Sequence, residues 1–571
     1  MTEGNANLTG FLPIVDDNSL GVSPGSGGQV GFACVAMGPS YTVPFLLSNW
    51  IRLRSKGDVT AYLGRGPGVE QLLDLFDDGV DPTNPNEGVQ EVLVRTIDMT
   101  GAAAATITAA PVVVGTGSAT CAGAGTPWLD RKYCIEILSS GNVGAAAGDL
   151  STATYKICDN YNVVDPNHRV WSEERKFIND SPTTTTVYLE QANAGANVKF
   201  TAGVGDDFVA GDLWIFSTTC AVPTITKQLL EYQDLIDYRG SDGFGIGGQG
   251  DTTAKGGITL LSTDRTHAAA DWDDIHAKIT NEWNNNQHAC HFIVPVPIAD
   301  RLVPAPYEFD IPTWVALCQT TSTTYRTITM VANNYIDGGI SLCAGYACRS
   351  TASTPSVTNP NIIRHQAGSM LGMLGRSKWH HSLGWKQKMR SIGVSKDGSG
   401  GTGCMYPWNS RLDNMTTAAG LNENTRIDRI AGSSSSNARM LTLRYMPGLW
   451  VSPEWDWTMA GVTSDFFCIA YYQLMYAVFA QIGAYFNKNF AGSPGLTDSD
   501  CALVQQAINA AILQPMTGND AVNQPYSASS IRVWVEADVL ITQQMQYELL
   551  LVPQASKRQL TGHAKLVRSV S

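Results

Sequence analysis

The chain has 571 residues, of which 43% are hydrophobic and only 16% are charged, and its formal net charge is −13. This length suits about two to four domains, and the hydrophobic fraction excludes wholesale disorder. The acidic balance argues against direct nucleic-acid binding, because phosphate recognition depends on clustered Lys and Arg. A low charge density leaves a weakly hydrated surface, which suits a protein that packs against copies of itself.

The first segment, residues 1–28, is predicted to be a tether and not a domain. It lacks the basic start and apolar run of a secretion signal, so none is expected. Its apolar side chains precede a glycine-rich stretch at 23–28, which is typical of a flexible joint. We therefore expect an N-terminal arm on a glycine hinge, whose apolar residues are Phe11, Leu12, Ile14 and Val15.

Residues 29–100 are predicted to form the first part of an α/β core. An apolar strand is expected at 30–37, a second extended piece at 44–47, and a third strand at 89–97. Between them, apolar residues at i, i+3, i+4 and i+7 predict a helix over 69–76. Gly79 stands where a left-handed C-terminal cap is expected.

Residues 101–222 differ in composition, being rich in Ala, Thr, Gly and Val. Short strand candidates are separated by turn signals, a pattern typical of an all-β unit. The candidates are 132–137, 154–158, 185–189, 198–201 and 213–217. We predict an inserted β-rich domain on the exterior of the protein.

The α/β pattern resumes over residues 223–435. Alternating strands and helices with short connections predict a parallel or mixed sheet with right-handed crossovers. The expected helices are one carrying Leu229 and Ile236, and others at 272–283, 312–319 and 362–374, the last with Gly375 beyond its end. The expected strands are 258–262, 292–296 and 325–332.

Residues 436–548 are predicted to form a C-terminal domain. The stretch 466–486 has 21 residues without a charge, but its two glutamines and four tyrosines favour a buried core helix over a membrane span. A second helix is expected at 500–513. The clearest strand follows, since Arg532, Trp534, Glu536 and Asp538 alternate with a series of apolar residues, namely Ile531, Val533, Val535, Ala537, Val539 and Ile541.

The tail at 549–571 is basic. No acidic residue follows Glu548, whereas four cations do: Lys557, Arg558, Lys565 and Arg568. One interpretation is an arm drawn to the acidic surface of another copy, and the other is a solvated tail that only adds solubility. Strand-forming residues favour the arm, namely Ala564, Leu566, Val567 and Val570.

No set of residues converges on catalysis. The GxGxxG match at 243–248 follows a helix and precedes none, so it predicts a loop and not a dinucleotide site. His288, Cys290 and His291 could ligate a metal, but no fourth ligand is evident. No P-loop or HExxH motif occurs. We therefore expect no catalytic, cofactor or metal site, and no enzyme.

The twelve cysteines include no CxxC pair. Most are expected to be small buried hydrophobes in a protein made in a reducing cytosol. The alternative is that some meet across subunits and oxidise after release from the cell. Cys343 and Cys348 are the closest pair and a candidate disulfide.

Several segments in order resemble the contractile tail sheath family. They are GFACVAMGPSYTVPFLLSN, YLGRG, LLDLFDDGV and VLVRTID near the start, then NIIRHQAGSMLGMLGRSKWHHSLG, and the long segment from MLTLRYMPGLW to GAYFNKN. The resemblance covers residues 20–100 and 225–571, and is one of order and pattern. The β-rich insertion lies outside it.

The resemblance implies a virion tail protein, assembled in the host cytoplasm, that stacks as six-membered rings around a rigid tube and contracts. It implies that both terminal arms add strands to neighbouring subunits, with the strand from Ile531 to Ile541 as acceptor. Tube contact falls to the C-terminal domain in this family, which points to Lys488. The implied partners are neighbouring sheath copies, the tail tube protein, and baseplate and tail-terminator proteins, with no direct nucleic acid and no membrane insertion.

Two other classes remain open. A static tail, baseplate or capsid-associated structural protein would share the low charge density, although tube proteins are usually shorter and mainly β. An envelope-degrading enzyme of the particle is disfavoured by the missing catalytic set.

Overall fold

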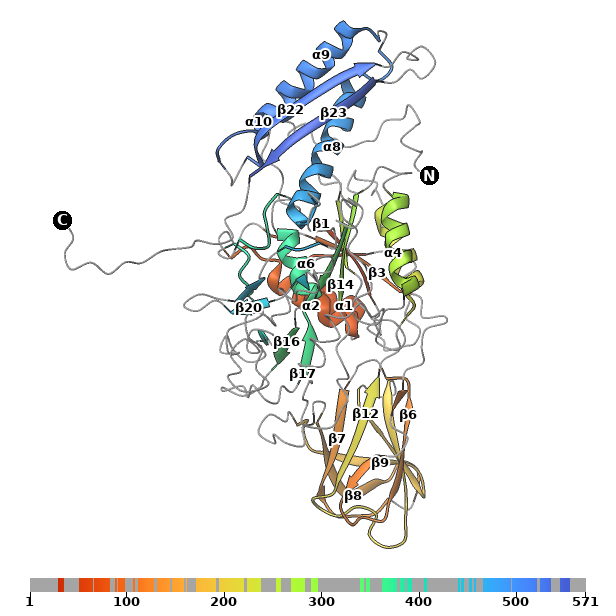
Figure 1. Ribbon diagram of the computed structural model, residues 1–571. Coiled ribbons are helices and arrows are strands. Elements are labelled where there is room, and N and C mark those ends of the chain that lie inside the picture. The colour runs from red at the N-terminus through yellow and green to blue at the C-terminus, as the bar shows by residue number, and fades with distance from the viewer. Residues whose placement is uncertain are drawn as a thin grey trace, which may run out of the picture.

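The computed structural model combines helices and strands in three parts arranged along one long axis (Figure 1). A curled antiparallel sheet lies at one end, a mixed core in the middle, and a unit of helices with one β-hairpin at the other end. The residues described are 29–34, 51–64, 66–82, 88–89, 91–97, 106–107, 111–127, 131–143, 146–158, 161, 171–190, 195–219, 223–237, 253–257, 269–282, 289–295, 339–343, 346–349, 362–376, 380–385, 388–392, 405–407, 440–441, 443–445, 451–453, 456–458, 466–493, 496–520, 524–535 and 545–554.

Several sequence predictions fall outside these residues. They are both groups of arm residues, the extended piece at 44–47, the GxGxxG loop, the strands at 258–262 and 325–332, and the helix at 312–319. Those predictions stay predictions.

The core contains two sheets with parallel pairing. In the first, β1 (Gln29–Cys34) runs parallel to β3 (Glu91–Thr96), and β2 (Ile51–Leu53) lies antiparallel on its other side. The second sheet is parallel throughout, in the order β13 (Thr253–Gly257), β14 (Ala289–Pro295), β15 (Ile340–Cys343) and β19 (Met440–Leu441).

Helices and small antiparallel sheets complete the core. The helices are α1 (Lys56–Leu63), α2 (Pro67–Asp78), α3 (Ile225–Asp237), α4 (Ala269–Asn281) and α6 (Ala367–Arg376). The strands of the small sheets are β16 (Tyr346–Arg349), β17 (Ile362–His365), β18 (Met405–Pro407), β20 (Leu443–Tyr445) and β21 (Val451–Pro453).

The α2–α6 contact forms the centre of the core. Every residue of α6 is buried. A Cβ atom at Gly368 or Gly372 would overlap the backbone carbonyls of Gln71 and Leu75 on α2. The two helices therefore pack backbone against backbone, which only glycine allows.

Two details differ from the sequence prediction. Gly79 has φ −75°, in the right-handed region and not the left-handed cap conformation. It is required for space, because a Cβ there would lie 2.8 Å from the carbonyl oxygen of Leu75. The helix expected over 362–374 begins only at Ala367 and includes Gly375, since Ile362–His365 pairs with β16 as a strand.

A buried arginine joins the end of α2 to residues 388–392. Arg376 donates hydrogen bonds to the carbonyl oxygens of Asp78 and Val80, each at 2.7 Å, and to those of Lys388 and Arg390 at 2.9 and 2.7 Å. Burial lowers the pKa of its guanidinium to about 10, opposed by the charges of Asp78 and Asp81. The group is therefore still charged at neutral pH, and its hydrogen bonds to four backbone carbonyls connect the two segments.

The curled sheet has nine strands, all within residues 106–219 and antiparallel in every described pair. The five strand predictions correspond to β7, β8, β10, β11 and β12, whereas β4, β5, β6 and β9 were not expected. The strands are β4 (Thr106–Ile107), β5 (Val112–Val114), β6 (Thr120–Gly125), β7 (Arg131–Ser139), β8 (Leu150–Cys158), β9 (Arg175–Ser181), β10 (Thr184–Tyr188), β11 (Ala196–Thr201) and β12 (Leu213–Thr219).

The curled sheet has its own aromatic core. The rings of Phe177 and Phe208 stack with centroids 4.3 Å apart, and Phe200 meets Trp214 edge to face at 5.2 Å. Arg131, the first residue of β7, forms an ion pair with Glu70 on α2, which ties this sheet to the core.

The C-terminal unit begins with the long uncharged segment, which forms α8 (Ile469–Asn489). It continues with α9 (Asp498–Ile508), a π-helical turn (Asn509–Leu513), α10 (Gln514–Met516), β22 (Tyr526–Val535) and β23 (Met545–Pro553). Among the described residues, no helix combines the length and the apolar character that a membrane crossing requires. In Figure 1, α8 leads from the core to the hairpin formed by β22 and β23.

Candidate assembly site: the β22–β23 hairpin

The strand predicted at 531–541 is present but begins earlier. It spans Tyr526–Val535, and Ala537, Val539 and Ile541 lie outside the described residues. It pairs antiparallel with β23 in a two-stranded sheet. The predicted boundary at 548/549 therefore falls inside β23, so residues 549–553 belong to the hairpin and not to an arm.

One face of the hairpin is apolar and packed on helices. Ile531 and Val533 are buried, with Leu549 and Tyr547 directly opposite them on β23. This face joins a cluster with Val478 and Ile482 of α8 and Val504 and Ile508 of α9. The alternation seen in the sequence over 531–535 thus corresponds to side chains that point inward at every second residue.

The other face carries polar and exposed apolar side chains. Arg532 lies opposite Glu548 and Trp534 opposite Gln546. The Arg532 guanidinium also lies 5.5 Å from the centre of the Trp534 ring. Beyond these pairs, Leu550 and Val552 are 59% and 54% exposed.

Local hydrogen bonds and a proline determine where the helices beneath the hairpin begin and bend. Thr497 caps α9 by accepting from the Asp500 N–H at 3.3 Å, and the Asp500 carboxylate accepts from the Thr497 N–H at 2.8 Å. Hydrogen bonds from Thr497 lower the pKa of Asp500. Pro515 has no N–H to donate to Ala511, which is consistent with the π-helical turn just before it.

The open edge of β22 is partly occupied. The Val533 N–H donates to Oε1 of Gln505 on α9 at 3.1 Å. Near the other end, the carbonyl oxygen of Tyr526 accepts from the Gly518 N–H at 3.0 Å. Two of the backbone groups along this edge therefore already have partners within the subunit.

The edge of β23 differs. Because the Val533 N–H points away from β23, Val533 and its partner Tyr547 form a non-hydrogen-bonded pair. The backbone N–H and C=O of Tyr547, and by alternation those of Leu549 and Leu551, therefore face away from β22. No strand among the described residues pairs with this edge. Such an edge is a template for adding a strand.

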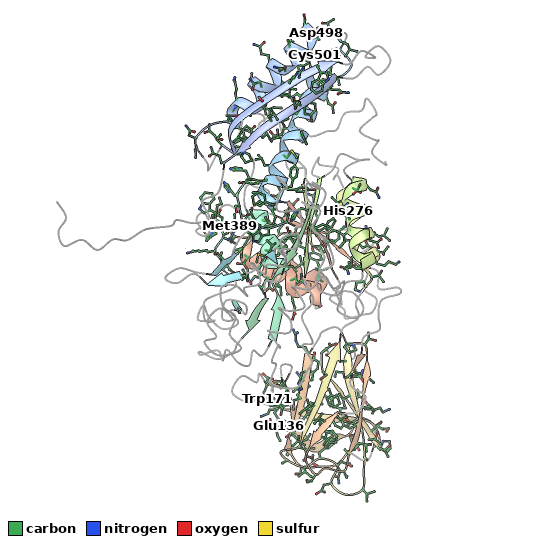
Figure 2. The ribbon with its side chains drawn as sticks, viewed as in Figure 1. Glu136, Trp171, His276, Met389, Asp498 and Cys501 are labelled. Carbon is green, nitrogen blue, oxygen red and sulfur yellow. The ribbon has the colours of Figure 1, made fainter. Side chains whose placement is uncertain are left out.

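Figure 2 labels Asp498 and Cys501 on α9 at the far end of this unit. Lys488, the predicted tube contact, lies in the last turn of α8 with its side chain exposed. Its neighbours Phe486 and Phe490 pack against the hairpin cluster, so Lys488 belongs to the same unit. The described residues do not test a contact with a tube.

The other predicted sites stay apart from the hairpin. Cys343 is fully buried on β15, whereas Cys348 lies on β16 of a separate sheet, and their pairing stays a prediction. His291 is buried with its ring centre 5.9 Å from that of Tyr472. Within the part of the chain that the structure describes, no group of three or more His, Cys, Asp or Glu is placed to hold a metal ion.

Sequence reasoning missed β23 and the role of Gln505. The run Leu549–Val552 is apolar and followed by Pro553, which could have indicated a strand. It was assigned to the basic tail because of the charges that follow. Nothing in the sequence marks Gln505, since its role depends on α9 lying against β22.

Solved structures similar to this chain include a tail sheath protein and sheaths of contractile injection systems. The sheath tail protein of Desulfitobacterium hafniense is 10% identical, with a TM-score of 0.35, over 95% of this chain and 100% of that one. The anti-feeding prophage sheath in its contracted state is 10% identical, with a TM-score of 0.42, over 99% of each chain.

A third similar structure is the sheath complex of the extracellular contractile injection system PVC, also contracted. It is 8% identical, with a TM-score of 0.28, over 49% of this chain and 65% of that one. No protein-family model matches the sequence, and no curated protein matches it.

Proposed function

We propose that this protein is the sheath subunit of a contractile tail, a structural protein and not an enzyme. It would polymerise as stacked six-membered rings around a tail tube and contract to drive the tube through a host envelope. The observation that carries the proposal is the two-stranded hairpin whose β23 edge has no partner strand among the described residues. The ordered sequence resemblance to contractile tail sheaths supports it independently.

In this proposal the terminal arms of neighbouring subunits complete the hairpin sheet. The N-terminal arm carries Phe11, Leu12, Ile14 and Val15, and the C-terminal arm carries Ala564, Leu566, Val567 and Val570. Each added backbone hydrogen bond contributes about 1 kcal/mol net, so a five-residue strand supplies a few kcal/mol. The open β23 edge accepts one arm directly, whereas an arm on β22 has to replace the contact from Gln505.

The remaining parts take supporting roles. The glycine-rich joint at 23–28 lets the body rotate while the arm stays docked. The unit containing Lys488 faces the tube, and the curled sheet, at the opposite end of the molecule in Figure 1, forms the exterior. Baseplate and tail-terminator proteins then close the ends of a virion tail.

Negative-stain microscopy of the full chain tests the proposal. We expect hollow helical cylinders. Removing residues 1–20 should leave a folded subunit, with an unchanged circular dichroism spectrum, that does not polymerise. Normal cylinders from this truncation would refute the arm assignment, and compact particles without cylinders from the full chain would favour a static structural protein.

A further inference from the structure

Two cysteines lie directly opposite one another in the curled sheet. Cys134 on β7 and Cys158 on β8 are register partners in an antiparallel pair. Both side chains are fully buried, and both are thiols in this structure. The assembly proposed above makes no use of them.

The register places the two cysteines within reach of a bond. The Ile157 N–H donates to Oγ of Ser172 at 3.0 Å, and the Ile157 carbonyl oxygen accepts from the Ser172 N–H at 2.8 Å. Both backbone groups of Ile157 therefore point away from β7. Its neighbour Cys158 therefore faces β7, and Cys134–Cys158 is a hydrogen-bonded pair with a Cα separation of about 5.5 Å. Disulfides bridge Cα atoms about 4.4–6.8 Å apart. Directly opposed residues also project to the same face of the sheet, so the two sulfurs share one environment.

This environment is separate from the aromatic core of the sheet. The cysteines cluster with Ile215, Tyr161 and the partly buried Trp171. The Trp171 ring is held by the Lys156 ammonium 4.5 Å above it, and Lys156 also pairs with Glu136 at 2.9 Å. Figure 2 shows Trp171 and Glu136 on the same side of the sheet. The pair is thus covered by a few side chains and not by the main core.

We propose that Cys134 and Cys158 form a redox site, which a small peroxide oxidises to a disulfide within the subunit. One thiolate attacks a peroxide oxygen, which breaks the O–O bond, releases water and leaves a sulfenic acid. The second thiol then attacks that sulfur, forms the S–S bond and expels a second water. Two thiols lose two electrons and two protons in total, and one hydrogen peroxide becomes two waters.

The geometry also indicates a reversible bond. Opposed Cβ atoms lie about 4.5–5.5 Å apart and are closer in non-hydrogen-bonded pairs, whereas a disulfide prefers about 3.8 Å. The strands must therefore shift slightly, and strained disulfides are the more easily reduced ones. The site suits a link that forms in an oxidising medium and opens again in a reducing one.

Cys121 provides an internal comparison in the same sheet. It lies on β6 and is partly exposed. Its register partner on β11 is Phe200 and not a second cysteine. Preferential oxidation of the more deeply buried pair would therefore follow from the pairing and not from exposure.

The test treats the full-length protein with hydrogen peroxide, blocks remaining thiols in denaturant and maps the peptides by mass spectrometry. We expect the peptides containing Cys134 and Cys158 to be joined, to separate on adding dithiothreitol, and to have lost two alkylation sites. In Cys134→Ser, we expect Cys158 to be trapped as a sulfenic acid by dimedone, with no link.

Complete alkylation of both cysteines after peroxide, or links only between different subunits, would overturn the proposal. A stability measurement stands beside the mapping and does not depend on any variant folding well. Unfolding of β7 and β8 is followed by hydrogen exchange at increasing urea concentrations. Its midpoint should lie at a higher urea concentration in oxidised than in reduced wild-type protein, and dithiothreitol should reverse the shift. Neither result depends on cylinder formation, so the assembly proposal is tested separately.

Discussion

The curled sheet and the hairpin are both antiparallel, but only one of them is complete. The curled sheet has nine strands, and its two ends, β4 and β6, lie near one another, so it encloses its own core. The hairpin has two strands, and its core consists of helices on one face only. A two-stranded sheet is marginal without such support.

In the proposed function, this difference decides where assembly takes place. A sheet that curls on itself has little need of another chain. The hairpin differs, because no described strand pairs with its β23 edge and because Leu550 and Val552 are exposed, which leaves capacity for binding. In that proposal, the curled sheet is a domain complete in itself, and the hairpin is a surface that a neighbouring subunit completes.

The largest expected effect comes from blocking the β23 edge. Leu551→Pro removes an N–H that faces the open edge while leaving the β22 ladder intact, and its ring obstructs an incoming strand. We expect the critical concentration for cylinder formation to rise about tenfold or more, since about 1.4 kcal/mol is tenfold. Sedimentation of cylinders measures it.

Leu551→Ala is the matched control, because it loses the same side-chain packing but keeps the N–H. Equal assembly by the proline and alanine variants would show that the edge takes no strand.

The next effect should be confined to the curled sheet. The Asp212 carboxylate is buried and accepts from the N–H groups of Thr116, Gly117 and Val209 at 3.0, 3.0 and 3.1 Å. Asp212→Ala leaves three amides without their acceptor, which should cost about 3 kcal/mol of unfolding free energy. Hydrogen exchange in β12 should report the loss.

Cylinder formation by Asp212→Ala should be unchanged at temperatures where the sheet stays folded. Asp212→Asn keeps one acceptor oxygen and should lie between wild type and alanine. Loss of cylinders from a folded Asp212→Ala subunit would contradict the independence of the two regions.

A pH effect is expected at the base of α8, which carries the hairpin. Burial raises the pKa of the Asp456 carboxyl above its ordinary value of 3.8, opposed by hydrogen bonds from Ser382 and the Ala470 N–H. The folded state therefore binds this proton more tightly than the unfolded state does. The contribution of Asp456 to stability is full below pH 3.8 and falls as pH rises through its raised pKa.

Asp456→Asn removes this dependence. We expect the unfolding free energy of wild type, relative to that of the variant, to decrease between about pH 3.5 and pH 7. A tenfold difference in proton affinity between the folded and unfolded states corresponds to about 1.4 kcal/mol. Urea unfolding at several pH values, followed by hydrogen exchange in α8, measures it. A pH-independent difference between the two proteins would contradict the raised pKa, and β7 of the curled sheet serves as the internal control.

The smallest effect should come from the β22 edge. Gln505→Ala removes the acceptor of the Val533 N–H and should cost about 1 kcal/mol in the isolated subunit. Gln505→Glu keeps an acceptor oxygen and should stay close to wild type. A comparison of urea midpoints distinguishes them, and equal midpoints for all three proteins would mean that this contact does not protect the edge.

Much of the local structure follows from the sequence alone. Periodicity predicted α2 and α4 to within a few residues, a long run without charge predicted α8, and alternation predicted a strand at Ile531–Val535. These patterns work because a helix or strand with one buried face repeats its apolar residues at a fixed spacing.

Only the tertiary structure decided the rest. Ile362–His365 forms a strand because β16 lies beside it. Position 79 needs a glycine because Leu75 and Val89 leave no room for a Cβ atom. Cys134 lies opposite Cys158 because of the register of β7 and β8. The same holds for the candidate site, since Gln505 occupies part of the edge of β22 while no described strand pairs with the edge of β23. Pairing and close approach join residues distant in the chain, and a single sequence records the preference of each residue but not its neighbour in space.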